Sequence, residues 1–340
     1  MAASPESVIK DLQNRKYAPV YFLQGEEPYY IDLISDYIEK NCLSESEKGF
    51  NQTVLYGKDV NMNTILLNAK RFPMMSERQV VIVKEAQEIS DLGKEAGDKQ
   101  LDAYLQNPLP STILVFAHKY KSLDGRKGLA KTMDKFAILV NSKKLYDNNL
   151  PEWVVGYLSG KSYKVSQKAA IMIADYIGNN LSRIANEMDK LLINLKPGEE
   201  VNEDLVEKHV GISKEYNVFE LQKALITKDV LKANRIVNYF DANPKNNPLI
   251  PIVTVLFNFF SKLLVLHGTE NKAEGNIAKE LGVNPYFAKD YITAGRAYSV
   301  GQVARIIHAI RQADMASKGI DSVSSSEGQI LKELVFKILH

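Results

Sequence analysis

The sequence predicts an α/β domain with a mostly parallel sheet, followed by two domains made of helices. Three observations lead to this fold class. Short apolar segments alternate with segments of helical spacing up to Asn141, and strand-like segments almost stop there. A chain of 340 residues is also too long for one ordinary hydrophobic core. We expect domains at residues 1–141, 142–212 and 213–340.

Five apolar segments are predicted to be strands of the first domain. One of them reads Gln-Val-Val-Ile-Val, which is typical of a parallel strand buried on both faces. Gly25 ends the first strand and Pro28 opens the helix after it, because proline fits the first turn of a helix. The predicted strands are residues 19–23, 52–56, 79–83, 112–117 and 136–140, and a second helix is predicted at 61–70.

Beyond Asn141 the apolar residues recur at helical spacing. Ser166 is placed to cap a helix that carries Ala169, Ile173 and Ile177 on one face. The predicted helices of the second domain are residues 150–158, 166–177, 181–195 and 202–210. Those of the third domain are residues 218–226, 230–240, 249–266, 277–281, 285–294, 300–316 and 329–339.

The composition is that of an ordinary soluble protein. Lys and Arg number 43 against 41 Asp and Glu, so the formal net charge is +2 and any basic surface must be local. Cys42 is the only cysteine, which excludes an internal disulfide and a cysteine-based zinc site, and we expect it to be buried. The N-terminus shows no basic region followed by an apolar stretch, so we expect no signal peptide and a cytoplasmic location.

The stretch from Leu249 to Leu266 is apolar enough to be compared with a membrane span. It contains Thr254, Asn258 and Lys262, whereas a spanning helix prefers about 20 apolar residues with few polar ones. Asn258 and Lys262 fall one turn apart on one side of the helix. We therefore expect a buried helix of a soluble domain and no membrane partner.

The turn after the first predicted strand indicates whether the α/β domain binds a nucleotide. A phosphate loop has the pattern G-x-x-x-x-G-K-[ST], because backbone amides and the lysine surround the phosphates. Here Gly25 is followed by Glu26 and Glu27, whose charges would repel a triphosphate. The Gly-Lys-Ser at residues 160–162 follows a predicted helix rather than a strand. We expect no ATP site in this chain.

No catalytic constellation is recognisable in the sequence. The five histidines show no metal-ligand spacing, and no G-x-S-x-G nucleophile motif is present. The acidic residues are scattered among helical segments, so no general acid–base pair can be nominated. We expect no catalysis by this chain alone, no metal site and no cofactor.

A basic cluster runs from His118 to Lys135, and its cations exceed its two aspartates by four charges. One interpretation is a solvated helix face, which is the favoured one from the residues alone. The other is contact with a phosphate backbone, which would be independent of base sequence and sensitive to salt. The candidate DNA-facing residues are Lys119, Lys121, Arg126, Lys127 and Lys131.

The segment from Phe72 to Ser76 is the most informative surface candidate. It joins a predicted helix to a predicted strand, and Pro73 stiffens it. The residues alone favour burial of Met74 and Met75 in the core. The alternative is an exposed pair of flexible apolar side chains presented to a partner's pocket, a use that suits methionine. Full burial of each would contribute about 1.5–3 kcal/mol.

Five segments, taken together and in order, resemble the delta subunit of bacterial DNA polymerase III. The most telling are N-E-[ML]-x-K-L at residues 186–191 and A-x-x-L-G-x-x-P-[YF] at residues 278–286. The resemblance covers nearly the whole chain, and the order and spacing of the segments carry it. The five segments are residues 21–29, 73–79, 178–191, 277–286 and 313–319.

The resemblance implies an AAA+-like domain, a small helical lid domain and a C-terminal helical collar domain. It also implies that this chain has no working nucleotide site and that partner subunits bind the ATP. In the family, a loop inserts two adjacent hydrophobic side chains into a pocket of the sliding clamp. The matching positions here are Met74 and Met75, flanked by Phe72 and Pro73. The family more often has Leu and Phe there, so this sequence departs in identity while it stays hydrophobic.

The function that the resemblance implies is that of a non-catalytic subunit of the DNA polymerase III holoenzyme, a DNA-directed DNA polymerase. It would bind the sliding clamp (beta) and open it for loading onto primed DNA during DNA replication, because it binds the open clamp best. The collar would join the clamp-loader ATPase subunits and delta-prime. The alternatives are an ATP-hydrolysing motor, a general DNA-binding or repair protein, and a helical adaptor without a clamp-opening role.

Overall fold

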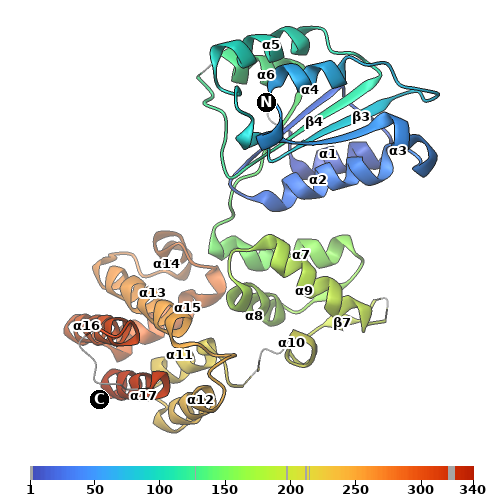
Figure 1. Cartoon of the computed structure of the whole chain (residues 1–340). Coiled ribbons are helices and arrows are strands. Elements are labelled where there is room, and N and C mark those ends of the chain that lie inside the picture. Colours follow the sequence, from blue (N-terminus) through green and yellow to red (C-terminus); the bar gives the residue numbers. More distant parts are fainter. Residues whose placement is uncertain (1–2, 127, 197, 211–212, 214, 321–325) are drawn as a thin grey trace. The chain divides into compact units, whose positions relative to one another are not determined.

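The computed structural model describes residues 3–126, 128–196, 198–210, 213, 215–320 and 326–340. The chain divides into two compact units, Met1–Leu145 and Tyr146–His340 (Figure 1). A further division of the second unit at residue 212 stays a prediction, because residues 211, 212 and 214 lie outside the described part.

The first unit is built on a five-stranded parallel sheet with the order β2-β3-β4-β1-β5. The last strand begins at Ile138 rather than at Phe136, because Phe136 is the final residue of helix α6. The strands are β1 Val20–Gly25, β2 Gln52–Tyr56, β3 Gln79–Lys84, β4 Thr112–Lys119 and β5 Ile138–Asn141.

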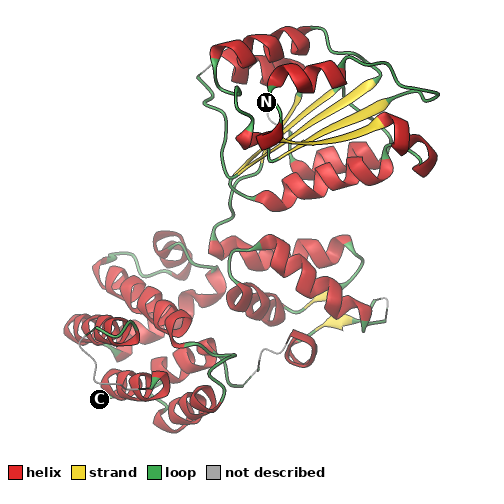
Figure 2. Cartoon of the chain, in the orientation of Figure 1, coloured by secondary structure: helices red, strands yellow, loops and turns green. Residues whose placement is uncertain are grey.

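Helices cover both faces of this sheet, as Figure 2 shows. Successive side chains of a strand point to opposite faces. Tyr21 and Leu23 therefore pack with α1 and α2, whereas Phe22 packs with α4, α5 and α6. Both faces are apolar, as the run at residues 79–83 predicts. The helices are α1 Pro5–Gln13, α2 Pro28–Asn41, α3 Glu45–Asn51, α4 Met62–Ala69, α5 Glu95–Gln106 and α6 Gly128–Phe136.

The second unit is helical apart from one short parallel pair, β6 Lys164–Val165 with β7 Glu200–Val201. Its first helices are α7 Leu150–Gly160, α8 Gln167–Ile177, α9 Leu181–Ile193 and α10 Glu203–Val210. The remaining helices are α11 Val218–Ile226, α12 Val230–Ala242, α13 Leu249–Gly268, α14 Glu274–Leu281, α15 Pro285–Ala297, α16 Val300–Ser317 and α17 Glu327–Leu339.

Helix α13 is the apolar helix that the sequence marked for comparison with a membrane span. Among the described residues it is the one helix long and apolar enough, by length and composition, to cross a membrane. Leu256, Phe260 and Leu263 are nevertheless fully buried in the core that α11 to α17 share. Burial lowers the pKa of Lys262, whose ammonium donates to the carbonyl of Gly282 over 3.4 Å. One face of the helix thus serves as core, as expected.

Candidate functional site

The loop between α4 and β3, residues 70–78, carries the predicted pair of apolar side chains. Met75 is fully exposed, Met74 is 56% exposed and Phe72 is 77% exposed. The burial that the residues alone favour is therefore not observed. Exposed large apolar side chains in a row mark a surface that can be covered by a partner.

A buried polar network ties the root of this loop to the sheet. The side-chain amide of Gln79 donates to the hydroxyl of Thr112 over 2.8 Å and also to the carbonyl of Arg71. The hydroxyl of Thr112 in turn donates to the carbonyl of Ala69 over 2.8 Å. Because buried polar groups need partners, this network holds the point where the chain leaves α4 and the point where it enters β3.

The end of α3 holds the middle of the loop. The side chain of Asn51 is buried, and its amide nitrogen donates to the carbonyl of Met74 over 2.9 Å. Its amide oxygen accepts the backbone N–H of Met74 over 2.6 Å. The hydroxyl of Ser76 donates to a carboxylate oxygen of Glu47 over 2.7 Å. Sequence reasoning missed these contacts, because nothing in the local pattern of residues 44–51 indicates a partner more than 20 residues away.

Glu47 is held on both sides by hydrogen bonds. Its second carboxylate oxygen accepts from the backbone N–H of Ser44 over 2.9 Å and from the Ser44 hydroxyl over 2.7 Å. These bonds, with that of Ser76, lower the pKa of Glu47 to about 2. The carboxylate that holds Ser76 therefore stays charged throughout the neutral range.

The basic cluster does not present all of its cations to solvent. Lys119 forms ion pairs with Asp32 over 2.8 Å and with Glu85 over 3.1 Å, and its side chain is mostly buried. Arg126 is exposed but binds both carboxylate oxygens of Asp124. Lys121 and Lys131 are exposed. The predicted residue Lys127 lies outside the described residues.

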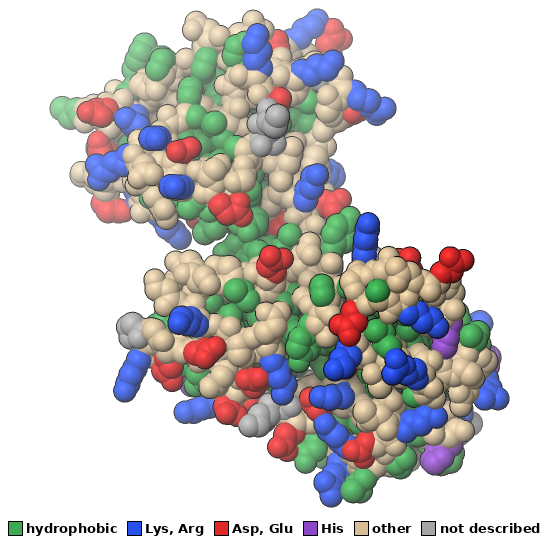
Figure 3. All heavy atoms as spheres, turned by 180° about the vertical axis from the view of Figure 1, so that it is seen from behind, with side chains coloured by type: hydrophobic (Ala, Val, Ile, Leu, Met, Phe, Trp, Pro, Cys, Tyr) green, Lys and Arg blue, Asp and Glu red, His purple; other side chains and the backbone are tan. Residues whose placement is uncertain are grey.

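The exposed loop and the basic cluster lie at opposite ends of the sheet. The loop precedes β3, whereas the cluster follows β4, and all strands are parallel. The structure therefore does not bring these two sets of candidate residues together. On the face shown in Figure 3, Lys and Arg side chains are interspersed with Asp and Glu, in keeping with the net charge of +2.

The crevice beyond the carboxyl ends of β1 and β4 is filled by the protein's own backbone. Open α/β sheets bind ligands at such a point, where the helices after neighbouring strands cover opposite faces. Here the N–H of Gly25 donates to the carbonyl of Lys121 over 3.1 Å. The N–H of Glu27 donates to Ser142 over 3.1 Å, and the Glu27 carboxylate accepts the N–H of Tyr29 over 3.0 Å. Three backbone amides of this turn therefore have partners within the protein.

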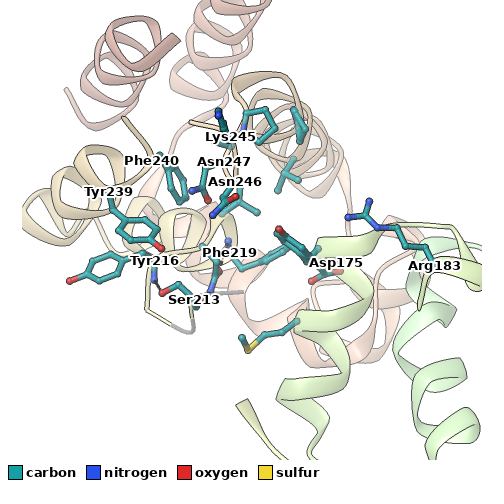
Figure 4. Close-up of a pocket in the computed structure, with 18 residues that line it drawn as sticks. Asp175, Arg183, Ser213, Tyr216, Phe219, Tyr239, Phe240, Lys245, Asn246 and Asn247 are labelled. Atoms are coloured by element: carbon teal, nitrogen blue, oxygen red, sulfur yellow. Dashed lines mark hydrogen bonds between the residues drawn. The ribbon is translucent and has the colours of Figure 1, made fainter. Parts of the chain in front are cut away.

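A pocket of about 300 Å³ lies within the second unit, between α8, α9 and the helices α11 to α13 (Figure 4). Tyr216 and Tyr239 stack at one end with ring centroids 5.0 Å apart, and Arg183 lies at the other. Burial, with a smaller effect of Asp147, raises the pKa of Asp175 to about 7. Its Oδ2 atom is buried without a hydrogen-bond partner among the described residues. The sequence analysis did not predict this pocket.

The described residues were also compared with the ligand sets that bind metal ions. No group of three or more His, Cys, Asp or Glu side chains among the described residues could hold a metal ion. The fold and the site together define an α/β protein with a parallel five-stranded sheet, joined to a helical unit and carrying an exposed apolar loop.

The chain belongs to the family of DNA polymerase III delta subunits. The family model "DNA polymerase III, delta subunit" matches residues 21–143, and the model of the delta subunit's C-terminal domain matches residues 215–337. Together they cover well over half of the chain. The family is that of a clamp-loader component of DNA replication.

The chain also resembles a curated relative and a solved structure. The DNA polymerase III subunit delta of Bacillus subtilis is 27% identical over 333 residues, which are 96% of this chain and 94% of the relative. The solved structure of the Bacillus subtilis DNA clamp loader delta protein is 24% identical, covers 98% of this chain and 99% of that chain, and has a TM-score of 0.62. The similarity to the solved structure is evidence of the fold alone.

Proposed function

We propose that this chain binds the sliding clamp through Met74 and Met75 and thereby opens it for loading onto primed DNA. The observation that carries the proposal is the exposure of both side chains on a loop whose backbone is held in place. Burial of each methionine in a partner's pocket would contribute about 1.5–3 kcal/mol. Phe72 extends the same apolar surface.

Opening follows if the loop binds the open clamp more tightly than the closed clamp. A ligand shifts an equilibrium only by its difference in affinity for the two states. The filled crevice beside Gly25 supports the proposal that the chain itself binds no ATP and that partner subunits supply this step. We further propose that α11 to α17 join those ATPase subunits and delta-prime, and that the chain works in the cytoplasm.

The test is binding of the purified chain to the sliding clamp of the same organism, measured by surface plasmon resonance. We expect Met74→Ala/Met75→Ala to weaken binding by about 100-fold or more, because about 3 kcal/mol or more of apolar burial is lost. Ile193→Ala is the matched control, since that side chain is 83% exposed in the other unit. Failure of the wild-type chain to bind would contradict the proposal, and undiminished binding by the double variant would place the anchor elsewhere.

A further inference from the structure

Asn51 occupies an unusual position for a polar side chain. It is the last residue of α3, and it is 3% exposed, whereas its neighbour Phe50 is 71% exposed. A buried side-chain amide has to find hydrogen-bond partners, since an unpaired one is costly. Asn51 finds them in a loop 23 residues away in the sequence.

The contact is made to the backbone of Met74 and not to its side chain. The Asn51 amide meets both the N–H of Met74, over 2.6 Å, and its carbonyl, over 2.9 Å. The same Asn51 nitrogen lies 3.3 Å from the carbonyl of Glu47 in its own helix. Because both backbone groups of Met74 are bound on the inner side, its thioether side chain is left to point outward.

Two residues further on, the loop is held a second time. The Ser76 hydroxyl donates to Glu47, which the amide and hydroxyl of Ser44 already fix. Met75 lies between the two attachments with a φ of +51°, in the left-handed region that residues with a side chain rarely adopt. Such a conformation persists only where its surroundings impose it. Helix α3 thus imposes the shape of the segment that carries Met74 and Met75.

We propose that Asn51 is a positioning residue that fixes the backbone at Met74, so that Met74 and Met75 are presented outward as a preformed pair. The effect of Asn51 on clamp affinity rests on the proposed clamp binding. A segment that is already ordered loses less conformational freedom when it binds, which improves affinity without any new contact.

The first experiment is hydrogen–deuterium exchange of the free chain, which needs no clamp. We expect Asn51→Ala to speed exchange of the Met74 amide by about fivefold, since it removes the acceptor of that N–H, a hydrogen bond that contributes about 1 kcal/mol. Asn51→Asp keeps the size of the side chain and an acceptor for the Met74 N–H, but removes the donor to the Met74 carbonyl, so it should speed this exchange less than Asn51→Ala does. Asn41→Ala is the matched control, because Asn41 also ends a helix and, among the described residues, donates only to Tyr37 in that helix.

The second experiment is clamp binding by the same variants. Asn51→Ala should bind about fivefold more weakly than wild type, Asn51→Asp should bind no more weakly than Asn51→Ala, and Asn41→Ala should bind as wild type does. Adding Asn51→Ala to the Met74→Ala/Met75→Ala variant should change affinity little, because the pair that Asn51 positions is already gone. If Asn51→Ala acted through a general loss of stability, it would instead lower the clamp affinity of the Met74→Ala/Met75→Ala variant further.

Unchanged exchange at Met74 in the folded Asn51→Ala variant would overturn the positioning role. The role would also be overturned if Asn51→Ala exchanged faster at Met74 but kept the clamp affinity of the wild type, while Met74→Ala/Met75→Ala lost binding. If the wild-type chain does not bind the clamp, the proposed function fails, and the exchange result still decides whether Asn51 holds the loop.

Discussion

At the scale of single residues, the turn after β1 packs closely against Ser142, which follows β5. Gly25 has a φ of +136°, and a Cβ placed there would lie 2.0 Å from the carbonyl oxygen of Ser142. The close approach of Ser142 therefore requires glycine at this position. Burial raises the pKa of Glu27, which caps α2 through the N–H of Tyr29.

Gly25→Ala should destabilise the protein by about 2–4 kcal/mol, because the added methyl group collides with backbone and the positive φ disfavours any side chain. Gly49→Ala is the control, since no atom lies within 4 Å of a Cβ at that helical position. It should be neutral or stabilise by up to about 1 kcal/mol. Chemical denaturation measures both, and equal effects of the two substitutions would contradict the argument.

Asp175 makes stability depend on pH. Its pKa is raised to about 7 in the folded protein, chiefly by burial. The folded state therefore keeps a proton that the unfolded state releases near pH 4, and stability falls as the pH rises from about 4 to about 7. Asp175→Asn should be more stable than wild type at pH 8, by at most about 4 kcal/mol, and similar near pH 4. Urea unfolding at both pH values measures this, and a variant with an unchanged pH profile would contradict it.

At the scale of elements, the cations of the basic cluster differ in whether they form ion pairs within the first unit or lie exposed. Lys119 joins β4 to Asp32 of α2 and to Glu85, so its charge is used within the unit. Lys121 and Lys131 lie exposed on the segment after β4 and on α6. We take these two as the candidates for contact with a phosphate backbone.

Lys121→Ala/Lys131→Ala should weaken binding of the chain to primed duplex DNA and make it less sensitive to salt. Each phosphate contact adds about 0.9 to the slope of log affinity against log salt, so the slope should fall by about 2. Fluorescence anisotropy at several salt concentrations gives the slope. Lys10→Ala, on the exposed side of α1, is the control. Identical slopes for the double variant and wild type would show that the cluster is a solvated face.

At the scale of the whole molecule, the two units have cores of their own. The two cores beside the sheet use side chains of the first unit, and the core around α13 uses side chains of the second. Phe260 is fully buried in the latter and packs edge-on against Tyr298. A cavity at this position should therefore affect the second unit more than the first.

Phe260→Ala should destabilise the second unit by about 3–5 kcal/mol, because it leaves a cavity in a packed core. The thermal transition of the first unit and the affinity for the clamp should stay as in wild type. Calorimetry and clamp binding well below the transition measure the two effects. A matching loss of clamp affinity would show that the second unit supports the loop.

The sequence by itself determined the five strands of the parallel sheet and most of the helices. These features depend on periodicity and on residues close together in the chain, which local physical chemistry governs. Helices α1, α3 and α5 were not predicted; α3, for example, carries a single large apolar residue, Phe50, which is exposed, so it shows no apolar stripe.

Only the tertiary structure decided which candidate residues are available to a partner. The exposure of Met74 and Met75 depends on Asn51, and the pairing of Lys119 depends on Asp32. These partners are distant in the sequence, and a residue type alone does not reveal whether a distant group will meet it. The order of the strands and the closure of the crevice by Ser142 are long-range for the same reason: they arise when the chain packs, not when its elements form.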